Sequence, residues 1–116
     1  MLNDCYNANP VSMRAALEHL AERGVGRRRV AVLGGMAELG AGSAGYHEEV
    51  ATLLRELGIE HVIAVGDSAR AYGGSWVATA DDAAARLREE LRPGDVVLVK
   101  GSRSVGLEVV AENLFE

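Results

Sequence analysis

Several residue types are scarce in this chain, and each shortage excludes a class of protein. Cys5 is the single cysteine among 116 residues, so no disulfide can form within the chain. No apolar run approaches the roughly 20 residues that a membrane-spanning helix needs. The first residues carry neither the basic part nor the long apolar part of a signal peptide. We therefore expect a cytoplasmic protein without a membrane span.

Positive charge is also scarce. The chain has 12 Lys and Arg residues against 17 Asp and Glu residues, and its formal net charge is −5. A protein that binds nucleic acid by neutralising phosphates needs the opposite balance, so we expect no nucleic-acid partner. The arginine run at 27–29 is too short to change that expectation. The length and the 48% hydrophobic content are those of one globular domain.

What the chain does contain is an alternation of short apolar runs and segments with helical periodicity. Because continuous apolar strands that alternate with helices form parallel sheets covered on both faces, the predicted fold class is α/β. It has three layers, α/β/α, around a mostly parallel sheet. Residues 1–9 are polar and irregular, so we interpret them as a junction segment before a domain at 10–116. The predicted strands are 30–33, 61–65, 76–78 and 96–99. The predicted helices run from 10 to Gly24 or Gly26, over 46–57, 68–72 and 81–91, and from Val105 or Gly106 to 115.

Lys100 is the only lysine, and it follows the best-defined apolar run, 96–99. The carboxyl ends of parallel strands meet at one edge of a sheet, where open α/β folds bind ligands. The segment 100–104, Lys-Gly-Ser-Arg-Ser, therefore brings an ammonium, two hydroxyls and a guanidinium to that edge, and these groups suit a carboxylate or a phosphate. The alternative is that Lys100 and Arg103 are solvated charges at a strand end.

Other motifs carry less weight. Residues 40–45 match the pattern GxGxxG, but the dinucleotide fingerprint needs its first glycine directly after the strand, and here the strand ends near Gly34. A glycine-rich loop is the favoured interpretation. The P-loop pattern GxxxxGK[ST] occurs nowhere. His47, which two glutamates follow, lacks further ligands at metal-binding spacing, so a structural role is favoured and no metal site is predicted.

Three segments together resemble one known family. They read NDCYNANPVSMRAAL at 3–17, VLGGMAELG at 32–40 and LVKGSRS at 98–104. They are similar to the C-terminal domain of Mur ligases, and within that family to the type that joins D-alanyl-D-alanine to UDP-N-acetylmuramoyl-tripeptide. The resemblance covers nearly the whole chain in order and spacing.

The resemblance implies a three-domain ATP-dependent ligase of peptidoglycan precursor synthesis, needed for cell wall, shape and division. The first domain would bind the UDP-sugar peptide, and the central one would hold ATP and Mg²⁺. The third domain is Rossmann-like, closes over the site and brings the amino substrate. ATP would phosphorylate the peptide carboxylate, and the amine of D-alanyl-D-alanine would attack the acyl phosphate. Residues 1–9 would then be the junction from the central domain. We expect this chain to be monomeric, to hold no cofactor alone and to be inactive alone.

Specific residues match the family's functional positions. Asp4 matches the aspartate that contacts the nucleotide ribose, and Asn7 and Asn9 match the rest of that nucleotide-binding junction motif. Lys100 and Arg103 match positions that face the acceptor and the transferring phosphate, and the resemblance makes them the catalytic residues. The substrate-binding set that it implies is Lys100, Ser102, Arg103 and Ser104. Whether Lys100 or Arg103 takes the acceptor carboxylate stays open.

Two points stand against a simple transfer of function. The family usually has an acidic residue where this chain has Gly35. If that acid contacts a ligand or orders the loop, this chain has lost that contact. A different class of function is a free-standing Rossmann-type module that binds a small ligand or a nucleotide without catalysis. The junction segment 1–9 speaks against that class, since a free-standing module needs no such segment.

Overall fold

The computed structural model describes residues 2–4, 10–35 and 43–100. The predicted last helix, 105–115, lies outside them. Most of the other predicted elements are confirmed, with ends that shift by one or two residues. The elements are β1 (Leu2–Asp4), α1 (Pro10–Arg23), β2 (Arg29–Gly34), α2 (Ser43–Glu56), β3 (His61–Val65), the 3-10 helix η2 (Asp67–Tyr72), β4 (Ser75–Val77), α3 (Ala80–Glu90) and β5 (Val96–Lys100).

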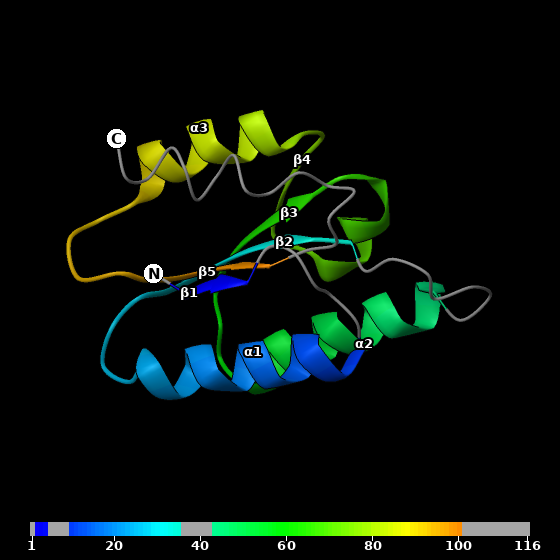
Figure 1. The fold of residues 1–116 in the computed structure, drawn as a ribbon, viewed down its shortest axis with the longest axis horizontal. Helices are drawn as coiled ribbons and strands as arrows, with labels where there is room; N and C mark the ends of the chain where they lie inside the picture. Colours follow the sequence, from blue (N-terminus) through cyan, green and yellow to red (C-terminus); the bar gives the residue numbers. More distant parts are fainter. Residues whose placement is uncertain (1, 5–9, 36–42, 101–116) are drawn as a thin grey trace.

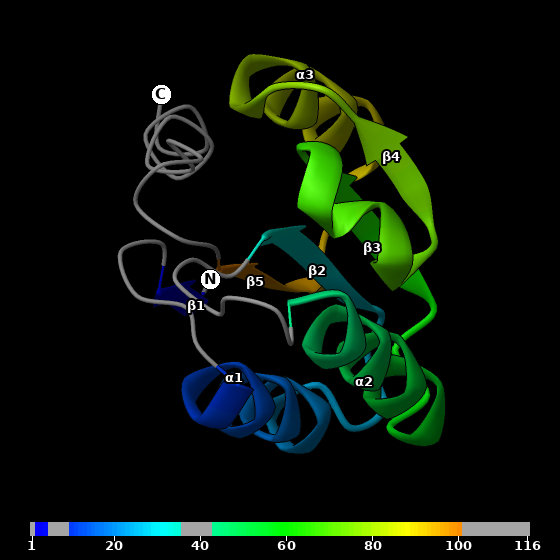
Figure 2. The same ribbon diagram turned by 90° about the vertical axis from the view of Figure 1, so that its right-hand side faces the viewer.

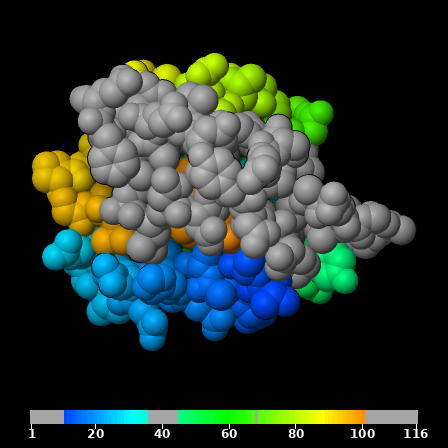
Figure 3. Space-filling view, in the orientation of Figure 1, coloured from blue at the N-terminus to red at the C-terminus, as the bar shows by residue number. Residues whose placement is uncertain are grey.

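The described strands form one five-stranded sheet in the order β1-β5-β2-β3-β4, and every pair in it is parallel. Helices α1 and α2 lie side by side against one face of this sheet, and α3 covers the other face (Figures 1 and 2). The space-filling view likewise shows α1 and α3 on opposite sides of the molecule (Figure 3). The predicted α/β fold with three layers and a parallel sheet is confirmed.

Each face of the sheet has its own apolar core, because successive side chains of a strand point to opposite faces. On β2, for example, Ala31 and Leu33 pack toward α1 and α2, whereas Val30 and Val32 pack toward α3. Helix α1 contributes one apolar stripe to the first of these cores. Met13, Leu17 and Leu20 of α1 are fully buried.

Two sequence-based predictions are wrong. Residues 1–9 are not irregular throughout, because Leu2–Asp4 forms β1 and pairs with β5. This strand has no alternating or apolar pattern of its own, so only its pairing partner reveals it. Helix α2 begins at Ser43 and includes Gly45, whereas we predicted a loop through Gly45 and a helix from Tyr46. The apolar stripe that indicated the helix begins only at its second turn.

Candidate functional site

The carboxyl ends of the strands gather at one edge, as predicted. Strand β5 ends at Lys100, β2 ends at Gly34, and β3 ends at Val65 next to Gly66. Lys100 lies between two neighbouring strands, in register with Leu33 of β2 on one side and with Asp4 of β1 on the other. The structure therefore brings the backbone of Asp4 next to that of Lys100, although 96 positions separate them in the chain (100 − 4).

Lys100 is buried, with 0% of its surface exposed. The alternative in which it is a solvated charge at a strand end is therefore wrong for this residue. Lys100 and Leu98 are two apart on β5 and share a face of the sheet, and Leu98 belongs to the core beneath α1 and α2. Lysines are almost never fully buried unless they are paired with another group.

Two further polar side chains are buried in the same layer. Tyr72 at the end of η2 donates a hydrogen bond from its hydroxyl to the carbonyl oxygen of Gly34, at 3.0 Å. The ring of His47, a residue of α2 that is 1% exposed, lies with its centroid 5.5 Å from that of Tyr72. Burial raises the pKa of Tyr72, so its hydroxyl stays protonated and keeps donating. Nothing in the sequence marks Tyr72, because a tyrosine in a short helix carries no motif.

Most of the predicted site residues lie outside the described part of the chain. Only Asp4 and Lys100 fall within it, and of Asp4 we describe the backbone alone. Gly35, which stands where the family usually has an acid, directly follows β2 and is buried. The predicted site residues outside the described part are Asn7, Asn9, Ser102, Arg103 and Ser104. Cys5, Gly40 and Gly42 also lie outside it.

Metal ligands do not gather in the described residues. Within 2–4, 10–35 and 43–100, no three His, Cys, Asp or Glu side chains are close enough together to hold a metal ion. In the same ranges no helix is both long and apolar enough to cross a membrane.

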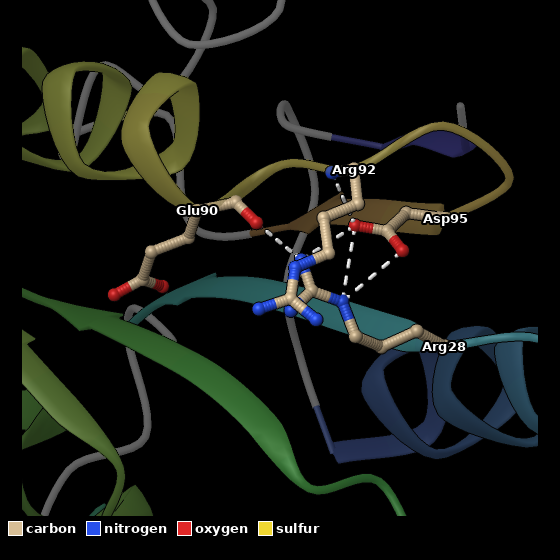
Figure 4. Close-up of polar contacts among 4 residues, drawn as sticks. All are labelled: Arg28, Glu90, Arg92 and Asp95. Atoms are coloured by element: carbon tan, nitrogen blue, oxygen red, sulfur yellow. Dashed lines mark hydrogen bonds and ion pairs between the residues drawn. The ribbon is translucent and has the colours of Figure 1, made fainter.

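A pocket of about 430 Å³ lies at the opposite edge, where the strands begin. Arg28 and Arg92 line it, and Asp95 holds Arg28 in place (Figure 4). The Arg28 guanidinium donates from Nε and Nη2 to the Asp95 carboxylate, with a shortest distance of 2.7 Å, and Nη2 also donates to the carbonyl oxygen of Glu90. This hydrogen bonding lowers the pKa of Asp95 and raises that of Arg28. The pair ties the start of β2 to the start of β5, far from Lys100.

Comparison with known proteins identifies the family. The family described as "Mur ligase, glutamate ligase domain" matches residues 1–103. The chain belongs to the Mur ligase family. The UDP-N-acetylmuramoyl-tripeptide–D-alanyl-D-alanine ligase of Mycobacterium tuberculosis is 41% identical over 143 residues, which cover 98% of this chain and 28% of the relative. The ligase of the same name from Escherichia coli is 40% identical and is matched over 100% of this chain and 27% of its own length.

Solved structures agree with these relatives. A MurF ligase from Thermotoga maritima, in complex with ADP, superposes with a TM-score of 0.78 at 30% identity, over 94% of this chain and 26% of that one. A MurF from Acinetobacter baumannii superposes with a TM-score of 0.79 at 33% identity, over 95% of this chain and 26% of that one. This chain thus spans little more than a quarter of the relatives that it matches. The similarity to Mur ligases over nearly its whole length does not favour a free-standing binding module.

Proposed function

We propose that this chain is the C-terminal, acceptor-binding domain of an ATP-dependent ligase that joins D-alanyl-D-alanine to UDP-N-acetylmuramoyl-tripeptide. The resemblance supplies the reaction, in which the tripeptide carboxylate is phosphorylated by ATP and the dipeptide amine then attacks the acyl phosphate. Two of the most similar relatives carry the name of that ligase. One solved relative was crystallised with ADP, which supports a nucleotide substrate.

The observation that carries the proposal is the position of Lys100. It stands at the carboxyl end of β5, and the backbone of β1 places Asp4 beside it. The predicted nucleotide residues, Asp4, Asn7 and Asn9, and the predicted acceptor residues that follow Lys100 thus start from neighbouring strand ends. A ligase that passes a phosphorylated carboxyl group to an amine needs these two sets close together.

The chemistry of Lys100 suits that step. Negative charge develops on the transferring phosphate and on the tetrahedral oxyanion, and a fixed cation in a site that excludes water stabilises both. Ser102, Arg103 and Ser104 are proposed to complete the acceptor site, and Arg103 can bind a carboxylate through two parallel hydrogen bonds. Either Lys100 or Arg103 takes the dipeptide carboxylate.

The proposal assigns ATP phosphates and Mg²⁺ mainly to the domains outside this chain. Mg²⁺ in nucleotide sites is usually held by one or two carboxylates together with substrate phosphates, so we propose that it binds where the ATP phosphates do. The sequence lacks the P-loop pattern that cradles a triphosphate. A ribose contact through Asp4 is the part of nucleotide binding that we propose for this chain. The proposed enzyme is a monomer that acts in the cytoplasm.

Lys100→Ala in the full-length ligase tests the proposal. We expect turnover to fall about a hundredfold, with the KM for ATP changed by less than about twofold, because the lost group acts mainly on the transition state. The readout is ATP-dependent formation of the amide product with saturating tripeptide. Arg92→Ala is the control, because Arg92 is an exposed cation at the opposite edge of the sheet. Unchanged turnover in Lys100→Ala would remove Lys100 from the mechanism and with it the proposal.

A further inference from the structure

The layer between the sheet and helices α1 and α2 is apolar except at one corner. His47 and Lys100 are the buried polar or charged residues of the described chain, and both lie in this layer. Tyr72, which is 4% exposed, belongs to the same core cluster and carries a hydroxyl into it. His47 lies in α2, Tyr72 is the last residue of η2, and Lys100 is the last residue of β5.

A series of neighbouring groups links the His47 and Tyr72 side chains to the backbone of Lys100. The His47 ring faces the Tyr72 ring at 5.5 Å between centroids with a tilt of 31°. The Tyr72 hydroxyl bonds the Gly34 carbonyl oxygen at 3.0 Å. Gly34 is the last residue of β2 and follows Leu33, the residue in register with Lys100. Because β2 and β5 are paired, a shift of the carboxyl end of β2 would also shift the backbone of Lys100.

Core packing alone does not account for a hydroxyl and an imidazole at this place. Taking polar groups out of water costs free energy, and a buried hydrogen bond exceeds that cost by only about 1 kcal/mol. A phenylalanine and an aliphatic side chain would fill the same volume without that cost. What the tyrosine adds is a directional contact that fixes one backbone carbonyl.

We propose that Tyr72 and His47 are positioning residues for Lys100. Tyr72 fixes the carboxyl end of β2 through the Gly34 carbonyl, and His47 holds the Tyr72 ring in the orientation that this bond requires. The end of β2 in turn sets where the backbone of Lys100 lies. This inference rests on the proposed function, since it assumes that Lys100 acts in the ligation step.

Tyr72→Phe in the full-length ligase is the central test, because it removes the hydroxyl and keeps the ring. We expect turnover to fall about tenfold with the KM for ATP unchanged, since a small displacement of a reacting group slows the chemical step. His47→Gln should act in the same direction and should add little to Tyr72→Phe, because both changes release the same carbonyl.

Trp76→Phe is the matched control. The Trp76 indole N–H donates to the Gly66 carbonyl oxygen at 2.8 Å, so it is also an aromatic donor to a glycine just beyond a strand. That glycine follows β3, which is not paired with β5. We expect Trp76→Phe to lower the melting temperature about as much as Tyr72→Phe does, but to leave turnover within about twofold of the wild-type value.

A double-mutant cycle separates the positioning role from a general loss of stability. If Tyr72 acts through Lys100, adding Tyr72→Phe to Lys100→Ala should change turnover by less than about twofold. A full tenfold additional loss, or equal effects of Tyr72→Phe and Trp76→Phe on turnover, would overturn the inference while the proposed function stands. If Lys100→Ala itself has wild-type turnover, the proposed function fails first, and the positioning role fails with it.

Discussion

At the scale of single residues, the chain places its cations in different surroundings. Lys100 is fully buried at a strand end, whereas Arg28 keeps 21% of its side chain exposed and binds Asp95 with two of its nitrogens. A guanidinium is a planar fork that matches a carboxylate, and an ammonium is a compact point charge. The arginine therefore suits the structural tie between two strands, and the lysine suits a confined site where charge develops.

The Arg28–Asp95 pair gives a pH-dependent prediction. The hydrogen bond from Arg28 lowers the pKa of Asp95 in the folded chain. The pair therefore stabilises the fold at pH values above the unfolded-state pKa of about 4, and this contribution is lost as the pH falls through the lower, folded-state pKa. Asp95→Asn should be less stable than the wild type at pH 7, and the difference should narrow below about pH 4. The measurement is the free energy of unfolding of both proteins, from urea titrations followed by circular dichroism between pH 7 and below about pH 4.

Asp67→Asn is the control for that experiment. Asp67 also pairs with an arginine, Arg70, but at 3.6 Å and with 95% of its own side chain exposed, compared with 4% for Asp95. Exposed pairs of this kind contribute little to stability, so Asp67→Asn should match the wild type at every pH. A difference between Asp95→Asn and the wild type that stays constant down to about pH 2 would show that the carboxylate charge is not what stabilises the pair.

The contacts that distinguish these residues could not be read from the sequence. The Tyr72 hydroxyl and the Gly34 carbonyl are 38 positions apart, and Arg28 and Asp95 are 67 apart. No local pattern marks such pairs, because they depend on how distant segments pack. The position of Lys100 at a strand end was predictable from the apolar run before it. Its burial was not, because burial depends on what the rest of the chain places around it.

At the scale of elements, prediction succeeded where a segment buries a continuous apolar pattern. Strand β3 has the predicted ends, His61–Val65, because each of its residues is apolar after the first and a glycine follows. Strand β1 was missed because its three residues, Leu-Asn-Asp, have no strand pattern and are ordered by pairing with β5. A strand that is ordered only by pairing can be predicted only when the position of its partner is known, and a single sequence does not give that position.

Gly74 carries a prediction about the turn between η2 and β4. Its φ is +76°, and a Cβ added there would lie 2.6 Å from the carbonyl oxygen of Val62, the second residue of β3. Gly74→Ala should therefore lower the free energy of unfolding by about 3 kcal/mol, through backbone strain plus a clash with backbone that cannot move away. Chemical denaturation of the purified chain measures the change.

Gly26→Ala separates the two contributions. Gly26 has nearly the same φ, +77°, but a Cβ there would meet nothing within 4 Å. Only the strain of a left-handed conformation remains, and it should cost about 1 to 2 kcal/mol. Equal losses for the two alanine variants would mean that the contact with Val62 adds nothing.

At the scale of the whole molecule, the alternation of strands and helices was enough to predict the fold class and the edge where the carboxyl ends of the strands meet. The order of the strands was not predictable in this way. The sequence of β5 does not indicate that it pairs with β1 on one side and with β2 on the other. This place next to the edge strand β1 is what puts the backbone of Asp4 beside that of Lys100. The family's motifs predict that both residues are functional, and the sheet order places their backbones side by side, as the proposed function requires.

The same reasoning predicts how the 116-residue chain behaves by itself. It should show neither ATP hydrolysis nor amide formation, because the sequence has no P-loop pattern to hold a triphosphate and the acyl phosphate must form before Lys100 can act. The assay supplies ATP, Mg²⁺, UDP-N-acetylmuramoyl-tripeptide and D-alanyl-D-alanine, and follows phosphate release and product, with the full-length ligase at equal concentration as the control. Steady ATP-dependent product formation by the chain alone would contradict our proposal that ATP is bound mainly by domains outside this chain. Its absence, together with the loss of turnover in full-length Lys100→Ala, would show that this domain contributes the acceptor side of a reaction whose activation step takes place elsewhere in the protein.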